Sequence, residues 1–176
     1  MKKNKKGFLI WVTGLSGSGK SLLANKIKKK LKEKFIDCIL INGDDLRKIF
    51  DLDKFDKKSR LRYGKSYSFL CKKLTDQGTN VIIATIAMFD EIRKWNKKNI
   101  NNYYEIYIKT PYKLIEKRNK KKLYLSNVSN VIGKDIKPEL PKKPNFIYLN
   151  NFKNQSNSFK KLNIDLEKFL KKVLSV

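Results

Sequence analysis

Apolar and polar residues follow one another in short blocks that predict buried strands separated by amphipathic helices. Five apolar runs have the length and composition of strands that are covered on both faces. These runs are Phe8–Thr13, Cys38–Ile41, Val81–Ala84, Ile106–Ile108 and Phe146–Leu149. Between the runs, apolar residues recur every three or four positions, which is the period of a helix with one buried face. The helical segments are Lys20–Lys34, Ser59–Gln77, Asp90–Asn99, Pro111–Lys120 and Ser158–Leu174.

This order of elements predicts an α/β fold with a five-stranded parallel sheet. Parallel neighbours need crossover connections, and right-handed crossovers place helices on both faces of the sheet. The length of 176 residues suits one hydrophobic core, and neither a repeat nor a linker is visible. We therefore expect one three-layer domain over residues 1–176.

Residues 119–145 interrupt this pattern. They contain three prolines, one glycine and many lysines. One interpretation is a solvated loop. In an enzyme that transfers phosphoryl groups, the same place in the chain is that of a mobile lid that closes over phosphates and excludes water. We interpret the segment as a lid.

A glycine-rich motif directly follows the first predicted strand. Residues 14–21 read G-L-S-G-S-G-K-S, and a predicted helix begins at the end of this run. Such a strand, loop and helix hold phosphates with backbone N–H groups and with the positive end of the helix dipole. A chance turn rich in Gly and Ser is the alternative. The predicted ATP-binding residues are Gly14, Leu15, Ser16, Gly17, Ser18, Gly19, Lys20, Ser21 and Leu22. Lys20 is expected to contact the β- and γ-phosphates, and Ser21 to ligate Mg²⁺.

Charged residues follow the second predicted strand in the run I-N-G-D-D-L-R at residues 41–47. Ligands of an open α/β sheet gather at the carboxyl ends of its strands, so these residues fall beside the phosphate loop. We predict that Asp44 orients or deprotonates an attacking hydroxyl, or holds Mg²⁺ through water. Arg47 is expected to clamp an anionic acceptor. The alternative is that Asp45 caps the helix that follows and that Arg47 lies on the surface.

The net charge of +26 raises the possibility of a nucleic-acid partner. Only five of the 42 cationic residues are arginines, and the lysines are spread along the whole chain. A dedicated nucleic-acid surface more often concentrates arginines and aromatic residues on one element. We therefore expect anionic small-molecule ligands and salt-sensitive non-specific binding, without a specific nucleic-acid partner.

Residue types that are missing or rare limit the chemistry further. The chain has no histidine, which excludes catalysis by imidazole. Cys38 and Cys71 lie far apart without a metal-binding or redox spacing, as core residues of a reducing compartment do. The apolar run after the basic N-terminus is too short for a secretory signal, and no apolar stretch approaches a membrane span. We expect a cytoplasmic protein.

The motifs together resemble the adenylylsulfate (APS) kinase family, which carries a G-L-S-G-x-G-K-[ST] loop and a D-G-D-x-x-R strand end. Residues 62–64 (R-Y-G), 104–108 (Y-E-I-Y-I) and 118–124 (R-N-K-K-K-L-Y) are similar to the family's R-[IV]-G, F-x-E-V-[FY]-[VI] and R-D-x-K-G-L-Y. The frame of F-T-G-I-D-x-P-Y-E-x-P-x-x-P is matched by Gly133, Asp135, Glu139, Pro141 and Pro144. The resemblance covers about residues 7–150.

The resemblance implies a kinase that uses MgATP and phosphorylates the ribose 3′-hydroxyl of a nucleotide with an activated anionic group. It also implies that Arg118 and Lys121 bring positive charge to the transferring phosphate. A homodimer is a further expectation from the family. The candidate acceptor-binding residues are Asp44, Arg47, Arg62, Ile86, Phe89, Lys121 and Ile132.

The sequence departs from the family on the acceptor and lid side. The family's F-T-G-I-D is V-I-G-K-D at residues 131–135, so the aromatic residue that stacks on the acceptor base is absent. Residues 84–89, A-T-I-A-M-F, replace the family's [AT]-F-I-S-P. A site without its stacking partner loses discrimination for that base. Adenylyl sulfate remains the first candidate acceptor. The alternative is cytidine diphosphoramidate, which APS-kinase-like proteins of surface-polysaccharide pathways phosphorylate.

Two other classes of function stay open. A kinase for a sugar acid or a shikimate-like hydroxyl would share only the phosphate loop. A basic ATP- or RNA-binding protein would bind nucleotide without transfer, and would leave Asp44 and Arg47 without a task. Aromatic residues of the predicted helices, Tyr63, Tyr67 and Trp95 among them, are interpreted as core and not as ligand platforms.

Overall fold

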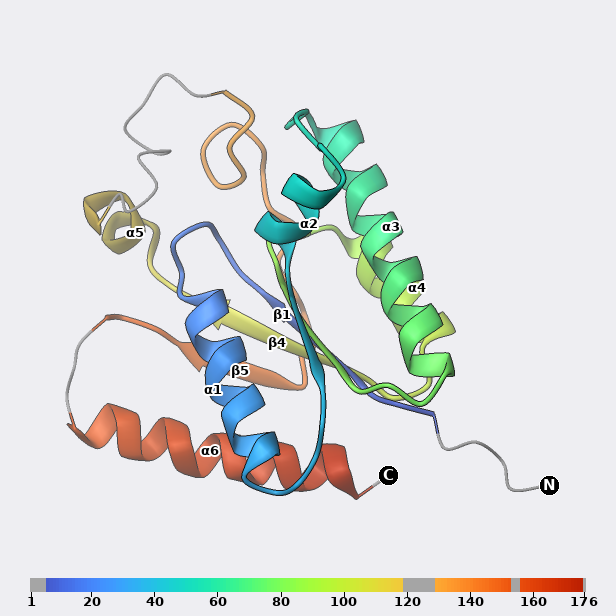
Figure 1. The fold of residues 1–176 in the computed structure, drawn as a ribbon. Helices are drawn as coiled ribbons and strands as arrows, with labels where there is room; N and C mark the ends of the chain where they lie inside the picture. The colour runs from blue at the N-terminus through green and yellow to red at the C-terminus, as the bar shows by residue number, and fades with distance from the viewer. Residues whose placement is uncertain (1–5, 119–128, 153–155, 176) are drawn as a thin grey trace.

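A computed structural model shows one parallel sheet between two layers of helices, as predicted (Figure 1). It describes residues 6–118, 129–152 and 156–175. The sheet order is β2-β3-β1-β4-β5, and every neighbouring pair is parallel. The strands are β1 (Leu9–Thr13), β2 (Ile39–Asn42), β3 (Val81–Thr85), β4 (Tyr103–Lys109) and β5 (Phe146–Leu149). Each predicted strand is therefore present, within a few residues of its expected bounds.

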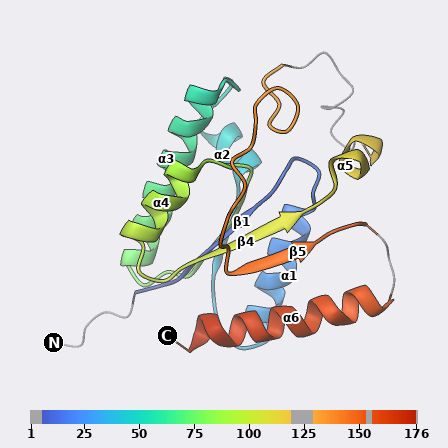
Figure 2. The same ribbon diagram turned by 180° about the vertical axis from the view of Figure 1, so that it is seen from behind.

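Helices cover both faces of this sheet (Figures 1 and 2). They are α1 (Lys20–Lys32), α2 (Gly43–Ile49), α3 (Lys57–Asp76), α4 (Asp90–Asn99), α5 (Tyr112–Arg118) and α6 (Ser156–Leu174). α1 and α6 pack on one face, and α3 and α4 on the other. α2 was expected only as the helix after Asp45. It already begins at Gly43, so both carboxylates of the N-G-D-D run lie in its first turn.

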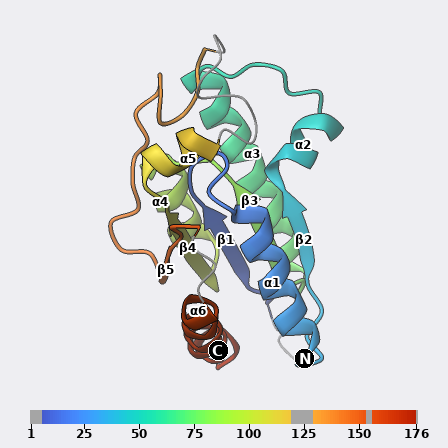
Figure 3. The same cartoon turned by 90° about the vertical axis from the view of Figure 1, so that its left-hand side faces the viewer.

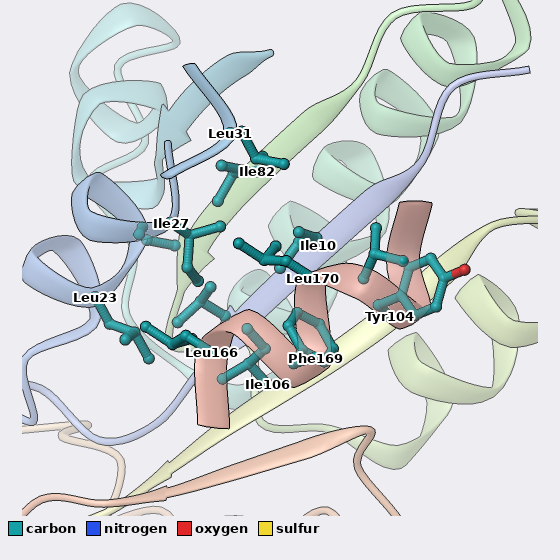
Figure 4. Close-up of a cluster of buried hydrophobic side chains, with 14 of the residues drawn as sticks. Ile10, Leu23, Ile27, Leu31, Ile82, Tyr104, Ile106, Leu166, Phe169 and Leu170 are labelled. Carbon is teal, nitrogen blue, oxygen red and sulfur yellow. The ribbon is translucent and has the colours of Figure 1, made fainter. Parts of the chain in front are cut away.

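The central strand β1 divides the core into two halves because its side chains alternate between the faces. Ile10 and Val12 join the cluster under α1 and α6, whereas Leu9 and Trp11 join the cluster under α3 and α4. Figure 4 shows the first cluster, in which side chains of α1 and α6 meet those of the sheet. Every residue of β1 is buried. The strand that carries the phosphate loop is thus fully enclosed by the rest of the domain.

One apolar position of the first helix does not belong to the core. The helical period, taken alone, assigns Leu22 to the buried face with Leu23, Ile27 and Leu31, but Leu22 is 75% exposed. Leu23, Ala24, Ile27 and Leu31 form the buried face of α1 instead. The helix is rotated so that its first turn directs Leu22 toward the ligand cavity described below.

The loops that follow the strands meet at the carboxyl edge of the sheet. Figure 3 shows the loop after β1 between α5 on one side and α2 on the other. Sheet order explains this arrangement, since β1 lies between β3 and β4 and the connections from both flanks reach over its end. Among the described residues, no helix has the length and the apolar character needed to cross a bilayer.

Candidate functional site

A cavity of about 1310 Å³ opens at the carboxyl edge of the sheet. It unites the two groups of residues that the sequence predicted separately. From the ATP-binding group, it is lined by Ser16, Gly17, Gly19, Lys20, Ser21 and Leu22. From the catalytic and acceptor group, it is lined by Asp44, Arg47, Ile86, Phe89, Arg118 and Ile132.

The remaining predicted residues divide into three cases. Gly14, Leu15 and Ser18 do not line the cavity but shape the loop that does. Arg62 is not brought to the cavity: its side chain is exposed, and its guanidinium carbon lies 5.6 Å from the centre of the Tyr63 ring. Arg60, two residues earlier on α3, lines the cavity instead. Lys121 lies outside the described residues.

The phosphate loop has the backbone geometry that its glycines allow. Gly17 and Gly19 have φ values of 76° and 98°, in the left-handed region that residues with a Cβ avoid. The Lys20 ammonium donates a hydrogen bond to the Leu15 carbonyl at 2.8 Å, which folds the side chain back over the loop. α1 begins at Lys20, so the positive end of its dipole faces the loop. The loop therefore provides a concave site for an anion.

Asn150, which follows the edge strand β5, forms a hydrogen bond with this loop. This residue was not predicted from the sequence. Its side-chain Nδ2 donates to the Ser18 carbonyl at 2.8 Å, and its backbone N–H donates to the Lys109 carbonyl at 3.0 Å. A methyl group on Gly19 would lie 2.9 Å from the same Nδ2. Asn150 directly follows β5, so the rule that ligands gather at carboxyl strand ends was the available signal.

Arg118 ends α5 beside Asn150 and the phosphate loop. Its guanidinium carbon lies 3.9 Å from the centre of the Phe152 ring, close enough for a cation–π contact. Both side chains line the cavity. The structure thus places the predicted cationic residue at the nucleotide end of the cavity, held by an aromatic ring from the segment after β5.

Asp44 lies in the first turn of α2, at the cavity wall. The N-cap residue of α2 is Asn42, whose amide donates to the Asp45 carboxylate at 3.1 Å. Asp45 therefore does not cap the helix, and the alternative interpretation of this residue does not hold. A methyl group on Gly43 would lie 3.0 Å from the Thr85 hydroxyl, so the start of α2 approaches the end of β3 closely. This close approach fixes the height of Asp44 above the sheet.

Arg47 organises the segment between α2 and α3. Its Nη2 donates to the carbonyls of Leu52 and Lys54 at 2.9 and 3.1 Å, and its guanidinium carbon lies 4.0 Å from the centre of the Phe55 ring. Arg47 and Phe55 both line the cavity. Part of the predicted acceptor clamp is thus engaged with the chain itself, and the ring of Phe55 is covered by a guanidinium.

Tyr67 is buried as predicted, yet it also lines the cavity. Its buried hydroxyl has no hydrogen-bond partner among the described residues. Burial raises the pKa of Tyr67, the nearby Arg47 guanidinium acts in the opposite direction, and Tyr63 and Asp44 raise it further. Asp44 and Arg47 therefore both influence the pKa of the Tyr67 hydroxyl at the acceptor end of the cavity.

Aliphatic and aromatic side chains form the opposite wall of this end. Ile86 and Phe89 come from the loop between β3 and α4, and Val131 and Ile132 from a compact turn over residues 131–136. Val131, at the position of the family's stacking aromatic residue, is buried and packs against Ile115. The wall offers apolar contact without an aromatic face at residue 131.

The described part of the predicted lid, residues 129–145, is docked on the core. Arg60 donates from Nη2 to the Asn130 carbonyl at 2.8 Å. At the other end, the Asn145 N–H donates to the Glu105 carbonyl at 2.9 Å. Residues 119–128 of the predicted lid lie outside the described residues.

A buried ion pair supports α4 beneath this wall. Arg93 is 6% exposed, and its Nε lies 3.7 Å from Oε1 of Glu105. Arg93 also pairs with Asp90. Burial raises the pKa of the Glu105 carboxyl to about 7, against the lowering effects of Arg93 and Lys97. Burying two charges costs free energy that their attraction only partly offsets, so this pair is a sensitive point of the fold.

The cavity also suits a magnesium ion that arrives with a nucleotide. Mg²⁺ prefers oxygen ligands and commonly keeps phosphate oxygens and waters in its coordination shell. Ser21 and Asp44 supply a hydroxyl and a carboxylate at the same cavity. Within the described residues, no group of three or more His, Cys, Asp or Glu side chains is placed to hold a metal alone. The donor set therefore fits a shared ion better than a resident one.

Proteins with similar sequences are kinases. The sequence model of the adenylylsulphate kinase family matches residues 6–148. A cytidine diphosphoramidate kinase of Campylobacter jejuni is 39% identical over 145 residues, which cover 80% of this chain and 84% of that protein. An adenylyl-sulfate kinase of Buchnera aphidicola is 31% identical over 168 residues, which cover 92% of this chain and 79% of that protein.

A solved structure extends the similarity to the whole fold. The Mycobacterium tuberculosis APS kinase CysC, in complex with AMPPNP and APS, superimposes with a TM-score of 0.79 and 29% sequence identity. The superposition covers 93% of this chain and 98% of that chain. The match spans the phosphate loop, the α2 motif and the docked turn, and this chain belongs to the adenylylsulphate kinase family of phosphotransferases.

Proposed function

We propose that this protein transfers the γ-phosphate of MgATP to the ribose 3′-hydroxyl of an activated nucleotide. The observation that carries the proposal is the single cavity that the phosphate loop shares with Asp44 and Arg47. Transfer requires donor and acceptor in line within one enclosed space. The related M. tuberculosis enzyme forms a complex with the ATP analogue AMPPNP, which supports ATP as the donor.

The roles of the residues follow from their places around the cavity. The loop amides and Lys20 would hold the β- and γ-phosphates, and Ser21 and Asp44 would contact the magnesium shell. Bound Mg²⁺ neutralises charge on the phosphate oxygens. Asp44 would orient the acceptor hydroxyl and receive its proton. Arg118, together with Lys121, would stabilise negative charge on the transferring group.

For the acceptor, we propose cytidine diphosphoramidate ahead of adenylyl sulfate, reversing the order that the motifs alone favoured. Val131 replaces the aromatic residue that stacks on adenine in the family, and Phe55 is covered by Arg47. The identity to the Campylobacter jejuni enzyme, 39%, also exceeds that to the Buchnera aphidicola adenylyl-sulfate kinase, 31%. A pyrimidine needs less stacking area than a purine, so a wall without an aromatic face at residue 131 suits it.

The test is a direct competition between the two acceptors. The protein is incubated with ATP, Mg²⁺ and either cytidine diphosphoramidate or adenylyl sulfate, ADP release is followed, and the product's phosphate position is determined by ³¹P NMR. We expect a 3′-phosphorylated cytidine product, with kcat/KM at least about tenfold higher than for adenylyl sulfate. A preference for adenylyl sulfate would establish the second candidate.

Two outcomes would overturn the proposal as a whole. ATP binding without transfer to either acceptor, together with a steep salt dependence of RNA binding, would support the non-enzymatic alternative. Transfer to a sugar acid but to neither nucleotide would support the other kinase class. The homodimer that the family suggests stays a prediction, and light scattering of the purified protein measures it.

A further inference from the structure

Glu139 lies on the docked segment, residues 129–145, and it is 49 residues from Asp90, the first residue of α4. It contacts the two residues on either side of Phe89. Its backbone N–H donates to the Met88 carbonyl at 3.0 Å. Its carboxylate Oε2 accepts a hydrogen bond from the Asp90 N–H at 2.6 Å. Phe89, between these two contacts, lines the cavity. The segment and the β3–α4 loop are thus joined at the residue that forms the acceptor wall.

The second of these bonds is a helix cap that comes from a distant segment. Phe89 is the N-cap residue of α4, and its side chain cannot accept a hydrogen bond from the first N–H groups of the helix. The Glu139 carboxylate supplies the missing acceptor and places a negative charge at the positive end of the helix dipole. A cap of this kind stabilises the first turn of a helix.

Arg93 secures the same contact from inside the core. Its Nη2 donates to the Glu139 carbonyl at 2.6 Å, while its other contacts are with Asp90 and Glu105. Lys57, at the start of α3, lies 3.9 Å from Oε1 of Glu139. Both the main chain and the side chain of Glu139 are therefore fixed to α4, and the charge of its carboxylate faces α3.

We propose that Glu139 is a positioning residue that couples the turn over residues 131–136 to Phe89. The two segments that form the acceptor wall are then positioned together. The inference rests on the proposed function, because the wall it positions is the acceptor end of the kinase cavity. The Val131–Ile136 turn and the Ile86–Phe89 loop then act as one unit. The phosphate loop, which has its own support from Asn150, is independent of it.

The first test separates the two substrates kinetically. Glu139→Gln keeps the size and one acceptor oxygen but removes the charge, and Glu139→Ala removes the cap. We expect the KM for the acceptor to rise about 3- to 10-fold in Glu139→Ala and less in Glu139→Gln, following the strength of the cap. The KM for ATP should stay within about twofold of wild type. Equal rises in both KM values would overturn the proposal.

The control is Glu167→Gln, which changes a carboxylate of similar exposure far from the cavity. The side chains of Glu139 and Glu167 are 38% and 35% exposed, and Glu167 pairs with Lys30 and Lys34 between α6 and α1. This variant should leave both KM values unchanged. A rise in acceptor KM in Glu167→Gln would show a general effect of lost charge and would overturn the positioning role.

A second measurement does not depend on the acceptor. Hydrogen exchange of the Asp90 amide reports directly on its bond to Glu139. We expect faster exchange at residues 90–92 in Glu139→Ala, and no change there in Glu167→Gln. Unchanged exchange would overturn the inference even in an active enzyme. An inactive wild-type protein with faster exchange in Glu139→Ala would instead overturn the proposed function and leave the structural coupling established.

Discussion

The nucleotide end and the acceptor end of the cavity are built in different ways. The nucleotide end consists mainly of one continuous stretch, residues 14–22, which a hydrogen bond from the distant Asn150 supports. The acceptor end is assembled from the start of α2, the α2–α3 segment, the β3–α4 loop and the 131–136 turn. A continuous stretch keeps its geometry through its own backbone. An assembled wall depends on contacts between segments, such as those of Arg47 and Glu139.

The largest expected effect belongs to the nucleotide end. Lys20→Ala removes the ammonium that is expected to contact the transferring phosphate. We expect kcat/KM to fall roughly 100- to 1,000-fold, with weaker ATP binding, because the variant loses a preorganised positive charge. Steady-state kinetics and ATP-binding calorimetry measure the two effects. Full activity in this variant would contradict the assignment of the phosphate loop.

Asp44→Asn probes the place where the two ends meet. The amide keeps the shape of the side chain but cannot accept the proton of the acceptor hydroxyl. Single-turnover transfer should fall roughly 100-fold while ATP binding persists, which is the scale of a lost general base. Asp45→Asn, the same change at the exposed neighbouring residue, which does not line the cavity, serves as a control. Unchanged turnover in Asp44→Asn would remove this role from Asp44.

A smaller effect on the free energy of unfolding is expected for Glu105, beneath the acceptor wall, and this effect depends on pH. The pKa of Glu105 is raised in the folded protein to about 7 from an ordinary value of 4.5, mainly by burial. A raised pKa means that the stability contribution is complete below about pH 4.5 and is lost as pH rises through about 7. Between pH 5 and 8, wild type should therefore lose about 1–3 kcal/mol of unfolding free energy relative to Glu105→Gln.

Urea denaturation at several pH values measures this difference. Arg93, Lys97 and Asp90 of α4 act on the same carboxyl, so the comparison uses one variant against wild type at each pH. Glu167→Gln is the matched control, because Lys30 and Lys34 hold the pKa of Glu167 below its usual range. Its difference from wild type should stay constant over this interval. A constant difference in Glu105→Gln as well would contradict the prediction.

The smallest expected effect tests whether the nucleotide end has a separate support. Asn150→Ala removes the hydrogen bond to the Ser18 carbonyl. The KM for ATP should rise about fivefold, which corresponds to about 1 kcal/mol for one lost hydrogen bond. The acceptor KM should not change, in contrast to Glu139→Ala. If both KM values rose together in either variant, the two ends would not be independently supported.

The continuous half of the site could be predicted from the sequence, and the assembled half only in part. The G-x-x-x-x-G-K-S spacing carries its own geometry, and five apolar runs were enough to predict the parallel sheet. Asp44 followed from the rule on carboxyl strand ends. Leu22 was misassigned because one residue of helical phase decides between core and cavity. Arg60 lines the cavity and Arg62 does not, because the two residues point in different directions around α3.

Contacts across long stretches of sequence left no local signal. The bond from Asn150 spans 132 residues, and the cap from Glu139 spans 49. Neither residue stands in a pattern that names its partner, and their partners are backbone groups, which every residue carries. Asp45 was the alternative cap for α2, but the helix starts three residues earlier than that cap requires, where Gly43 closely approaches Thr85. Tertiary packing, not local preference, sets that boundary.

The position of β1 in the middle of the sheet has a consequence for how such enzymes diversify. Its neighbours on both sides hold the strand in register, so the phosphate loop extends from a strand that is paired along both edges. The residues that are proposed to bind the acceptor lie on peripheral loops, where insertions and substitutions leave the sheet intact. Duplicated genes can therefore acquire new acceptors by exchanging peripheral segments while they inherit the phosphoryl-donor machinery unaltered.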